Sequence, residues 1–321
     1  AILARLVWRE SLISKLYAFL VRGRRSIGRA RGRRMSEWRR GDESLAASVS
    51  GLRVYGPWSL ERLHVRIVDG LRRYREDVES GAEAHWQSVL SAKPHVFDGP
   101  VWCLLSAQAA EDAASREARV TLQVQRSSFK YVLYTHMTDQ GRQLLPADRA
   151  DALGIMALTE TVDGYIVYGK RSAKLATMPS HWHCVPAGNM SSTEPRSVLE
   201  QELQEELDCD WSMARSVKVL AVLDTGDEQG NKPEIVCWLH LALSAADVLA
   251  RYQKAEDRAE HDGLMFVNAR SSEAGAAENG LDPAPSFPTV SLDDFLRDFL
   301  LTDVSRRALH MFRLMRGGGS I

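Results

Sequence analysis

The sequence predicts an α/β protein in which a mixed β-sheet lies between helices. Two observations predict this class. Short apolar runs typical of strands recur between residues 101 and 267, and stretches with helical periodicity lie among them at 194–207 and after them at 292–315. The 321 residues, 45% hydrophobic and 26% charged, suffice for one large globular domain or two modest ones.

The elements are expected in the following order. Leu60, Leu63, Ile67 and Leu71 recur at helical spacing and predict a helix over 60–79. Strands are predicted at 101–105 and 120–124, and a hairpin at 153–158 and 165–168 with Asp163-Gly164 in its turn. Further strands follow at 217–222, 235–243 and 264–267. A loop is predicted over 271–288, and terminal helices over 292–301 and 306–315.

Charge divides the chain into a basic tail and an acidic body. Glu10 and Glu37 are the only acids among the first 40 residues, which are rich in arginine. Such a tail resembles an organelle transit peptide and is equally suited to a membrane surface, so the compartment stays open. The overall net charge of −1 argues against a nucleic-acid partner. We expect a tail over 1–50, an α+β extension over 51–150, a main domain over 151–298 and a C-terminal helix over 299–321.

The four cysteines lie far apart and form no CxxC pair. A zinc site or a disulfide framework is therefore not expected, and reduced thiols in an intracellular protein are the simplest interpretation.

The segment 185–208 carries the chemistry. Pro195 suits the first turn of a helix, and Thr193 is a candidate N-cap. On that helix Glu202 and Glu206 are four residues apart and share a face, with Glu205 beside them. Like charges so placed repel, and either solvent or a bound cation must offset the repulsion. Magnesium prefers carboxylate oxygens and completes its shell with water and phosphates. A plain solvated helix face is the alternative interpretation.

This segment resembles the Nudix box, G-x5-E-x7-R-E-U-x-E-E-x-G-U, where U is aliphatic. Gly188 and Glu194 have the first spacing, and residues 202–206 match E-U-x-E-E. The gap between Glu194 and Gln201 is one residue short, Gln201 replaces the arginine, and Asp208 replaces a glycine at a helix end that favours positive φ. These departures favour an atypical or inactive site but remove no metal ligand.

A wider series of motifs narrows the resemblance. It comprises the residues around Trp86 and Phe97-Asp98-Gly99-Pro100, then Ser128-Phe129-Lys130, then Ala150-Asp151-Ala152-Leu153-Gly154, and then Lys170-Arg171-Ser172. In this order, over about residues 82–268, they resemble the "motif 22" branch of Nudix hydrolases, which cleave UDP-glucose and UDP-galactose. The implied fold is the Nudix α/β/α sandwich with an N-terminal extension.

The resemblance implies a role for each matched residue. Glu202, Glu205 and Glu206, with the carbonyl of Gly188, would hold Mg²⁺, with Mn²⁺ as a substitute. Glu206 is the candidate catalytic residue of this set, and Glu194 and Gln201 are structural positions of the box.

The resemblance also implies a general base in a loop before a late strand, for which Glu260 is preferred over Glu256, Asp262 and His261. Glu234, Lys170 and Arg171 are candidate substrate-binding residues, since arginine suits phosphate. Trp182 is interpreted as a packed aromatic rather than a base-stacking one, and Phe97-Asp98-Gly99-Pro100 as a structural turn. His181 and His183 lack the partners that a zinc site needs.

The predicted function is therefore magnesium-dependent hydrolysis of a nucleoside diphosphate sugar, a small-molecule partner, to a nucleoside monophosphate and a sugar 1-phosphate. ADP-ribose is an alternative substrate within the same chemistry. A degenerate Nudix domain that binds a nucleotide or a protein without turnover is the rival from another class. Contact with a membrane is expected only through the basic tail.

Overall fold

A computed structural model of the chain describes residues 52–317 except 95, 112–117, 176, 227–230 and 270–286. Within these residues the strands form two sheets, a nine-stranded mixed sheet and a three-stranded one. The strands of the large sheet are β1 (Leu52–Ser59), β5 (Gly154–Glu160), β6 (Tyr165–Arg171), β7 (Trp182–Cys184), β8 (Ala187–Asn189), β9 (Ala214–Asp224), β10 (Pro233–Leu241), β11 (His261–Asn268) and β12 (Thr289–Ser291).

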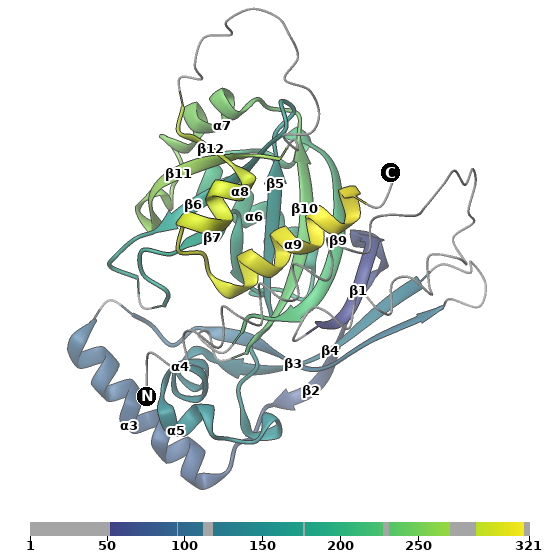
Figure 1. Cartoon of the computed structure of the whole chain (residues 1–321). Coiled ribbons are helices and arrows are strands. Elements are labelled where there is room, and N and C mark those ends of the chain that lie inside the picture. Colours follow the sequence, from purple (N-terminus) through teal and green to yellow (C-terminus); the bar gives the residue numbers. More distant parts are fainter. Residues whose placement is uncertain are drawn as a thin grey trace, which may run out of the picture. The chain divides into compact units, whose positions relative to one another are not determined.

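The large sheet has the strand order β1-β9-β10-β5-β6-β11-β12, with β8 paired to β5 and β7 paired to β6 (Figure 1). Pairing is antiparallel except between β10 and β5 and between β11 and β12. Every residue of β5 is buried. A strand at the centre of a sheet covered on both faces has no solvent side, which explains its continuous apolar character.

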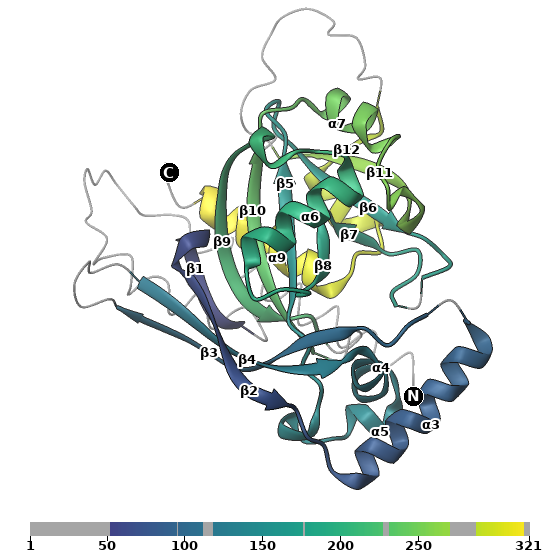
Figure 2. The same cartoon turned by 180° about the vertical axis from the view of Figure 1, so that it is seen from behind.

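Helices cover both faces of the large sheet. One core contains residues of α6 (Pro195–Leu207) and α7 (Ala245–Tyr252), and the other contains residues of α8 (Leu292–Asp298) and α9 (Asp303–Gly317). Figure 1 shows α8 and α9 in yellow in front of the sheet, and Figure 2, from behind, shows α6 in front of it. The α/β/α sandwich is thus confirmed as the fold class.

The small sheet belongs to the predicted extension. It has the order β2 (Leu63–Leu71), β4 (Ala118–Ser128) and β3 (Pro100–Glu111). The helices of this region are α3 (Glu76–Ala92), α4 (Phe129–Met137) and α5 (Asp139–Arg142). Val132 of α4 packs with Val101 and Cys103 of β3 and with the alanines of the segment 150–152. This packing holds α4 at the junction between the extension and the start of β5.

The prediction of a helix over residues 60–79 is wrong. The structure has a 3-10 turn at Leu60–Arg62, then strand β2, and the helix α3 begins only at Glu76. The spacing of Leu63 and Ile67 also suits one face of a twisted strand, and parallel pairing of Leu63 to Val120 and Ile67 to Val124 decides the outcome. Tertiary pairing overrides local periodicity of this kind.

The other predicted strands and both terminal helices are confirmed within a few residues. The predicted hairpin joins β5 to β6, and Gly164 has a φ of 86° in its turn. Most of the predicted loop over 271–288 and all of the basic tail lie outside the described residues. None of the described helices is both long and apolar enough to span a membrane.

The domain boundaries stay predictions. One strand, however, pairs across the predicted boundary between the extension and the main domain. β1 lies inside the predicted extension and pairs antiparallel with β9 of the large sheet. The extension therefore contributes an edge strand to the main sheet as well as a sheet of its own.

Candidate active site

A cavity of about 480 Å³ is lined by α4 of the extension and by strand β8 and helix α6 of the main domain. Its charged wall carries side chains from four separate parts of the chain. These are Arg171, Glu202, Glu205, Lys232, Glu234, Asp257 and Glu260, together with the backbone of Gly188. Two helices that contribute to the lining of the cavity, α4 and α6, are labelled in Figure 2.

Helix α6 supplies the central carboxylates. Pro195 occupies its first turn as predicted, but the N-cap is Glu194 rather than Thr193, because the helix begins immediately at the proline. Val198, Leu199, Leu203 and Leu207 are buried against the sheet. This stripe fixes the rotation of the helix and turns Glu202 and Glu205 toward the cavity.

Glu206 lies deeper than its neighbours on α6. It is 3% exposed, and Oε2 of its carboxylate accepts a hydrogen bond from the Ala187 N–H of β8 at 3.2 Å. Burial, followed by repulsion from Glu202 and Glu260, raises the pKa of Glu206 well above its ordinary value. An ionised carboxylate at this depth is unfavourable unless a cation offsets its charge.

Gly188 gives Glu202 its position. Strand β8 pairs with β5 through Ile155 and Gly188, and a Cβ added at position 188 would overlap the Glu202 carboxylate. Gly188, whose carbonyl is a predicted metal ligand, thus also accommodates the Glu202 side chain. Burial and repulsion from Glu205, Glu260 and Asp257 raise the pKa of Glu202 to about 7.

The turn before β11 contributes the remaining acidic side chains of the charged wall, Asp257 and Glu260. Glu260 ends a 3-10 turn at Arg258–Glu260 and lines the cavity, whereas Glu256 and Asp262 do not. The Asp257 N–H donates to the Glu205 carbonyl at 2.9 Å, which ties this turn to α6. Burial and neighbouring acids raise the pKa of both Asp257 and Glu260.

His261 is not among the residues that line the cavity. It is 6% exposed, and burial together with the nearby Arg171 lowers its pKa to about 4. The His261 ring packs against Gly169 of β6.

Two cations face the acids. Arg171, at the end of β6, donates through Nε and Nη2 to the Thr177 carbonyl at 3.1 Å, and burial lowers its pKa. Lys232 donates to Glu234 Oε2 at 2.7 Å at the start of β10. A Cβ at position 154 would overlap the Glu234 carboxylate, so Gly154 leaves room for this pair.

The donor chemistry suits a divalent metal ion. Four acidic side chains, Glu202, Glu206, Asp257 and Glu260, have pKa values raised by burial and by repulsion from neighbouring carboxylates, and hard cations prefer such oxygen ligands. Among the described residues, however, no three Asp, Glu, His or Cys side chains are arranged to hold one ion as they stand. The metal stays a prediction that the chemistry of these residues fits.

The other predicted residues lie elsewhere. Lys170 precedes Arg171 on β6 and does not line the cavity, because side chains alternate across a strand. Glu194 is exposed at the start of α6, and Gln201 donates to Glu205 Oε1 at 2.8 Å from the exposed side. Trp182 packs edge-on against Phe295 and Phe299, which confirms it as a packed aromatic.

Sequence reasoning missed several residues that line the cavity. Lys232 and Asp257 both line it, and the only sequence signal for them is that they lie close to Glu234 and Glu260 along the chain. His183 also lines it. The ring is buried, its Nδ1 lies 2.8 Å from Thr302 Oγ1, and burial keeps its pKa well below the ordinary value. No local pattern could have paired His183 with Thr302, which lies immediately before α9 and more than a hundred residues further along the chain.

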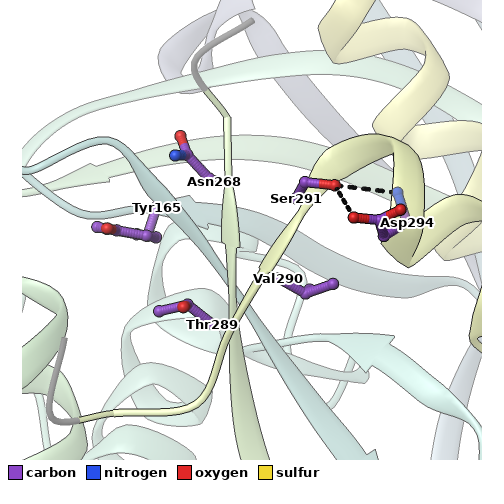
Figure 3. A pocket seen from close by; sticks show the side chains of 6 residues that line it. All are labelled: Tyr165, Asn268, Thr289, Val290, Ser291 and Asp294. Atoms are coloured by element: carbon purple, nitrogen blue, oxygen red, sulfur yellow. Dashed lines mark hydrogen bonds between the residues drawn. The ribbon is translucent and has the colours of Figure 1, made fainter. Parts of the chain in front are cut away.

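A second hollow of about 370 Å³ lies on the β11–β12 side of the sheet and is lined by Tyr165, Asn268, Thr289, Val290, Ser291 and Asp294 (Figure 3). Ser291 caps α8 by accepting from the Asp294 N–H at 3.2 Å, and its hydroxyl bonds to the Asp294 carboxylate. These polar groups satisfy one another as a helix cap, and the hollow holds none of the predicted site residues.

No protein-family model and no curated protein matches the chain. Several solved structures do. DR0079 of Deinococcus radiodurans has 19% identity and a TM-score of 0.26 over 32% of this chain, and this chain covers 64% of its length, which is less than two thirds.

Two other matches cover more of this chain. A MutT protein of Methanosarcina mazei Go1 has 18% identity and a TM-score of 0.32, covering 53% of this chain and 96% of that one. RenU, a Nudix hydrolase of M. smegmatis, has 12% identity and a TM-score of 0.30, covering 53% and 87%.

Proposed function

We propose that the chain is a Nudix-type pyrophosphohydrolase that cleaves a nucleoside diphosphate sugar of the UDP-glucose or UDP-galactose kind. The observation that carries this proposal is the acidic cluster of α6 and the turn before β11, which lines one cavity together with Arg171 and Lys232. An acidic cluster beside two cations suits a metal-bound diphosphate better than it suits a neutral ligand. The ordered motifs of the sequence support the narrower substrate.

In this proposal Glu202, Glu205 and Glu206 hold Mg²⁺ or Mn²⁺, which when bound neutralises phosphate charge and makes water more acidic. Glu260 accepts the proton of the attacking water. The water oxygen forms a bond to one phosphorus, and the bond from that phosphorus to the bridging oxygen breaks. Arg171 and Lys232 orient the anionic diphosphate, and the products are a nucleoside monophosphate and a sugar 1-phosphate.

The experiment is a turnover assay on the full chain. The protein is incubated with Mg²⁺ or Mn²⁺ and with UDP-glucose, UDP-galactose or ADP-ribose, and the released monophosphate is measured. We expect turnover of a UDP-sugar and a loss of at least about a hundredfold in Glu206→Gln, the range for removing a group that stabilises transition-state charge. Glu200→Gln is the matched control, since Glu200 lies on the exposed side of α6 and does not line the cavity.

A second candidate is a binding module without turnover. The hydrogen bond from Gln201 to Glu205 favours it, because a neutral amide stands where an arginine would otherwise offset the acidic charge. Binding of UDP-glucose without product release, by wild type and by Glu206→Gln alike, is the outcome that would replace the enzyme proposal with this one.

A further inference from the structure

The cavity has a second wall that differs in character from the first. It comes from the extension and consists of Phe97, Phe129, Val132, Leu133 and Met137, with His136 among them. Val132 and Leu133 are buried, so they form the base of this wall, and the two phenylalanines lie nearer to solvent. One cavity therefore joins an apolar face to a charged one.

The apolar wall is held in place by the turn at Phe97-Asp98-Gly99. The Phe129 N–H donates to the Gly99 carbonyl at 2.9 Å, and the Lys130 N–H donates to Asp98 Oδ1 at 2.8 Å. Asp98 thereby caps the first turn of α4, whose own N-cap residue, Ser128, makes no side-chain cap. The turn and the helix are fixed to each other, and so are the two aromatic residues that they carry.

Gly99 leaves room for the first ring, that of Phe97. A Cβ added to Gly99 would come within 2.8 Å of Phe97 Cε2, so the ring lies across the glycine. Phe97 is 78% exposed, the largest exposed fraction among the exposed large hydrophobic side chains of the described residues. The turn therefore keeps an aromatic ring uncovered at the edge of a cavity, although burying it would be favourable.

We infer that this wall receives the aromatic base of a nucleotide whose phosphates lie at Arg171 and Lys232. The inference rests on the proposed function and adds to it: the extension, through Phe97 and Phe129, selects ligands that carry a flat base. The two unlike walls orient the ligand: its planar end meets the aromatic rings, and its phosphates meet Arg171 and Lys232, where a bound metal ion would offset the charge of the neighbouring carboxylates. A cavity of this volume lies in the usual range for small-molecule sites.

The test measures binding separately from turnover. The full chain is titrated by calorimetry with UDP, ADP and inorganic pyrophosphate, once in Mg²⁺ and once in EDTA. We expect Phe97→Ala to weaken the binding of a nucleotide about tenfold, the effect of losing one stacked base, and to leave pyrophosphate binding unchanged. Phe97→Tyr should retain the wild-type affinity, and Phe97→Leu should not, because the leucine side chain is apolar but not flat.

The matched control is Leu145→Ala. Leu145 is also in the extension, is 67% exposed, and does not line the cavity, so its truncation should change neither affinity. Equal weakening of UDP and pyrophosphate by Phe97→Ala, or no weakening of either, would overturn the inference. Tighter binding of geranyl diphosphate than of UDP would overturn it too, in favour of an aliphatic ligand.

The outcome also separates this inference from the proposed function. If a UDP-sugar is hydrolysed and Phe97→Ala leaves KM unchanged, the function stands and the base-binding wall does not. If no sugar nucleotide is hydrolysed but nucleotide binding depends on Phe97, the wall stands and the enzyme does not. If neither UDP nor ADP binds in any condition, both are overturned.

Discussion

Helices α6 and α4 line the same cavity with opposite chemistry. α6 turns glutamates toward it and buries an apolar stripe against the large sheet, whereas α4 turns apolar side chains toward it and is capped from another segment by Asp98. The difference teaches that the cavity suits a ligand with two unlike ends. It also shows that two helices with different stabilising contacts meet at one site, so each can be perturbed separately.

The largest expected effect tests the attachment of α6. Leu203→Ala should lower the free energy of unfolding by about 2–5 kcal/mol, because the side chain is fully buried and its loss leaves a cavity. Urea unfolding measures it. Gln204→Ala, on the exposed side of the same helix, should change little, and a loss below about 1 kcal/mol for Leu203→Ala would mean that α6 is not packed as described.

The next effect tests the acidic character of α6. The raised pKa of Glu202 means that the folded protein binds its proton more tightly than the unfolded chain does. The contribution of Glu202 to the free energy of unfolding is therefore fully present below the unfolded pKa near 4.5. This contribution is lost as the pH rises through the folded pKa of about 7. At pH 8 in EDTA, Glu202→Gln should be more stable than wild type by on the order of 1–3 kcal/mol.

Urea unfolding at pH 8 and pH 4 measures this effect, and the gain should shrink at the lower pH. Mg²⁺ or Mn²⁺ should stabilise wild type more than the variant at pH 8. Glu200→Gln, which is exposed, serves as the control. If Glu202→Gln is less stable than wild type at pH 8 without metal, then repulsion among these carboxylates does not destabilise the folded protein, and the prediction is wrong.

A smaller effect tests the cap of α4. Asp98→Ala should cost about 1 kcal/mol, because the Lys130 N–H at the start of the helix loses its acceptor. Asp98→Asn keeps an acceptor oxygen and should cost less. Thermal unfolding followed by circular dichroism compares the two, and equal losses would show that the carboxylate charge, rather than the cap, matters.

The smallest effect concerns the end of α6. Asp208 ends the helix with a φ of 53°, the left-handed conformation that favours the glycine expected there from the Nudix pattern. Asp208→Gly should therefore stabilise the protein by about 0.5–1 kcal/mol. Asp210→Gly should instead destabilise it, since Asp210 is extended and accepts from the Ser212 N–H. A loss of stability in Asp208→Gly on urea unfolding would contradict this account.

Much of the fold could be predicted because its signals are local. The apolar run of β5, the Asp163-Gly164 turn and the Pro195 start of α6 each lie within a few residues. The segment 63–71 could not be assigned correctly from the same kind of signal, since its strand depends on pairing with β4 more than fifty residues later. The role of Asp98 as a cap depends on packing in the same way, because the helix it caps begins thirty-one residues further on.

The sequence by itself determined the glutamates of α6, their spacing from Gly188 and the helix that carries them, because helical geometry places residues three and four apart on one face. Only the tertiary structure decided that Arg171 rather than Lys170 meets them, that Lys232 and Asp257 join them, and that α4 closes the cavity. These residues come from separate strands, turns and helices. Their meeting is set by sheet order and by packing between distant segments, which no local pattern of the chain encodes.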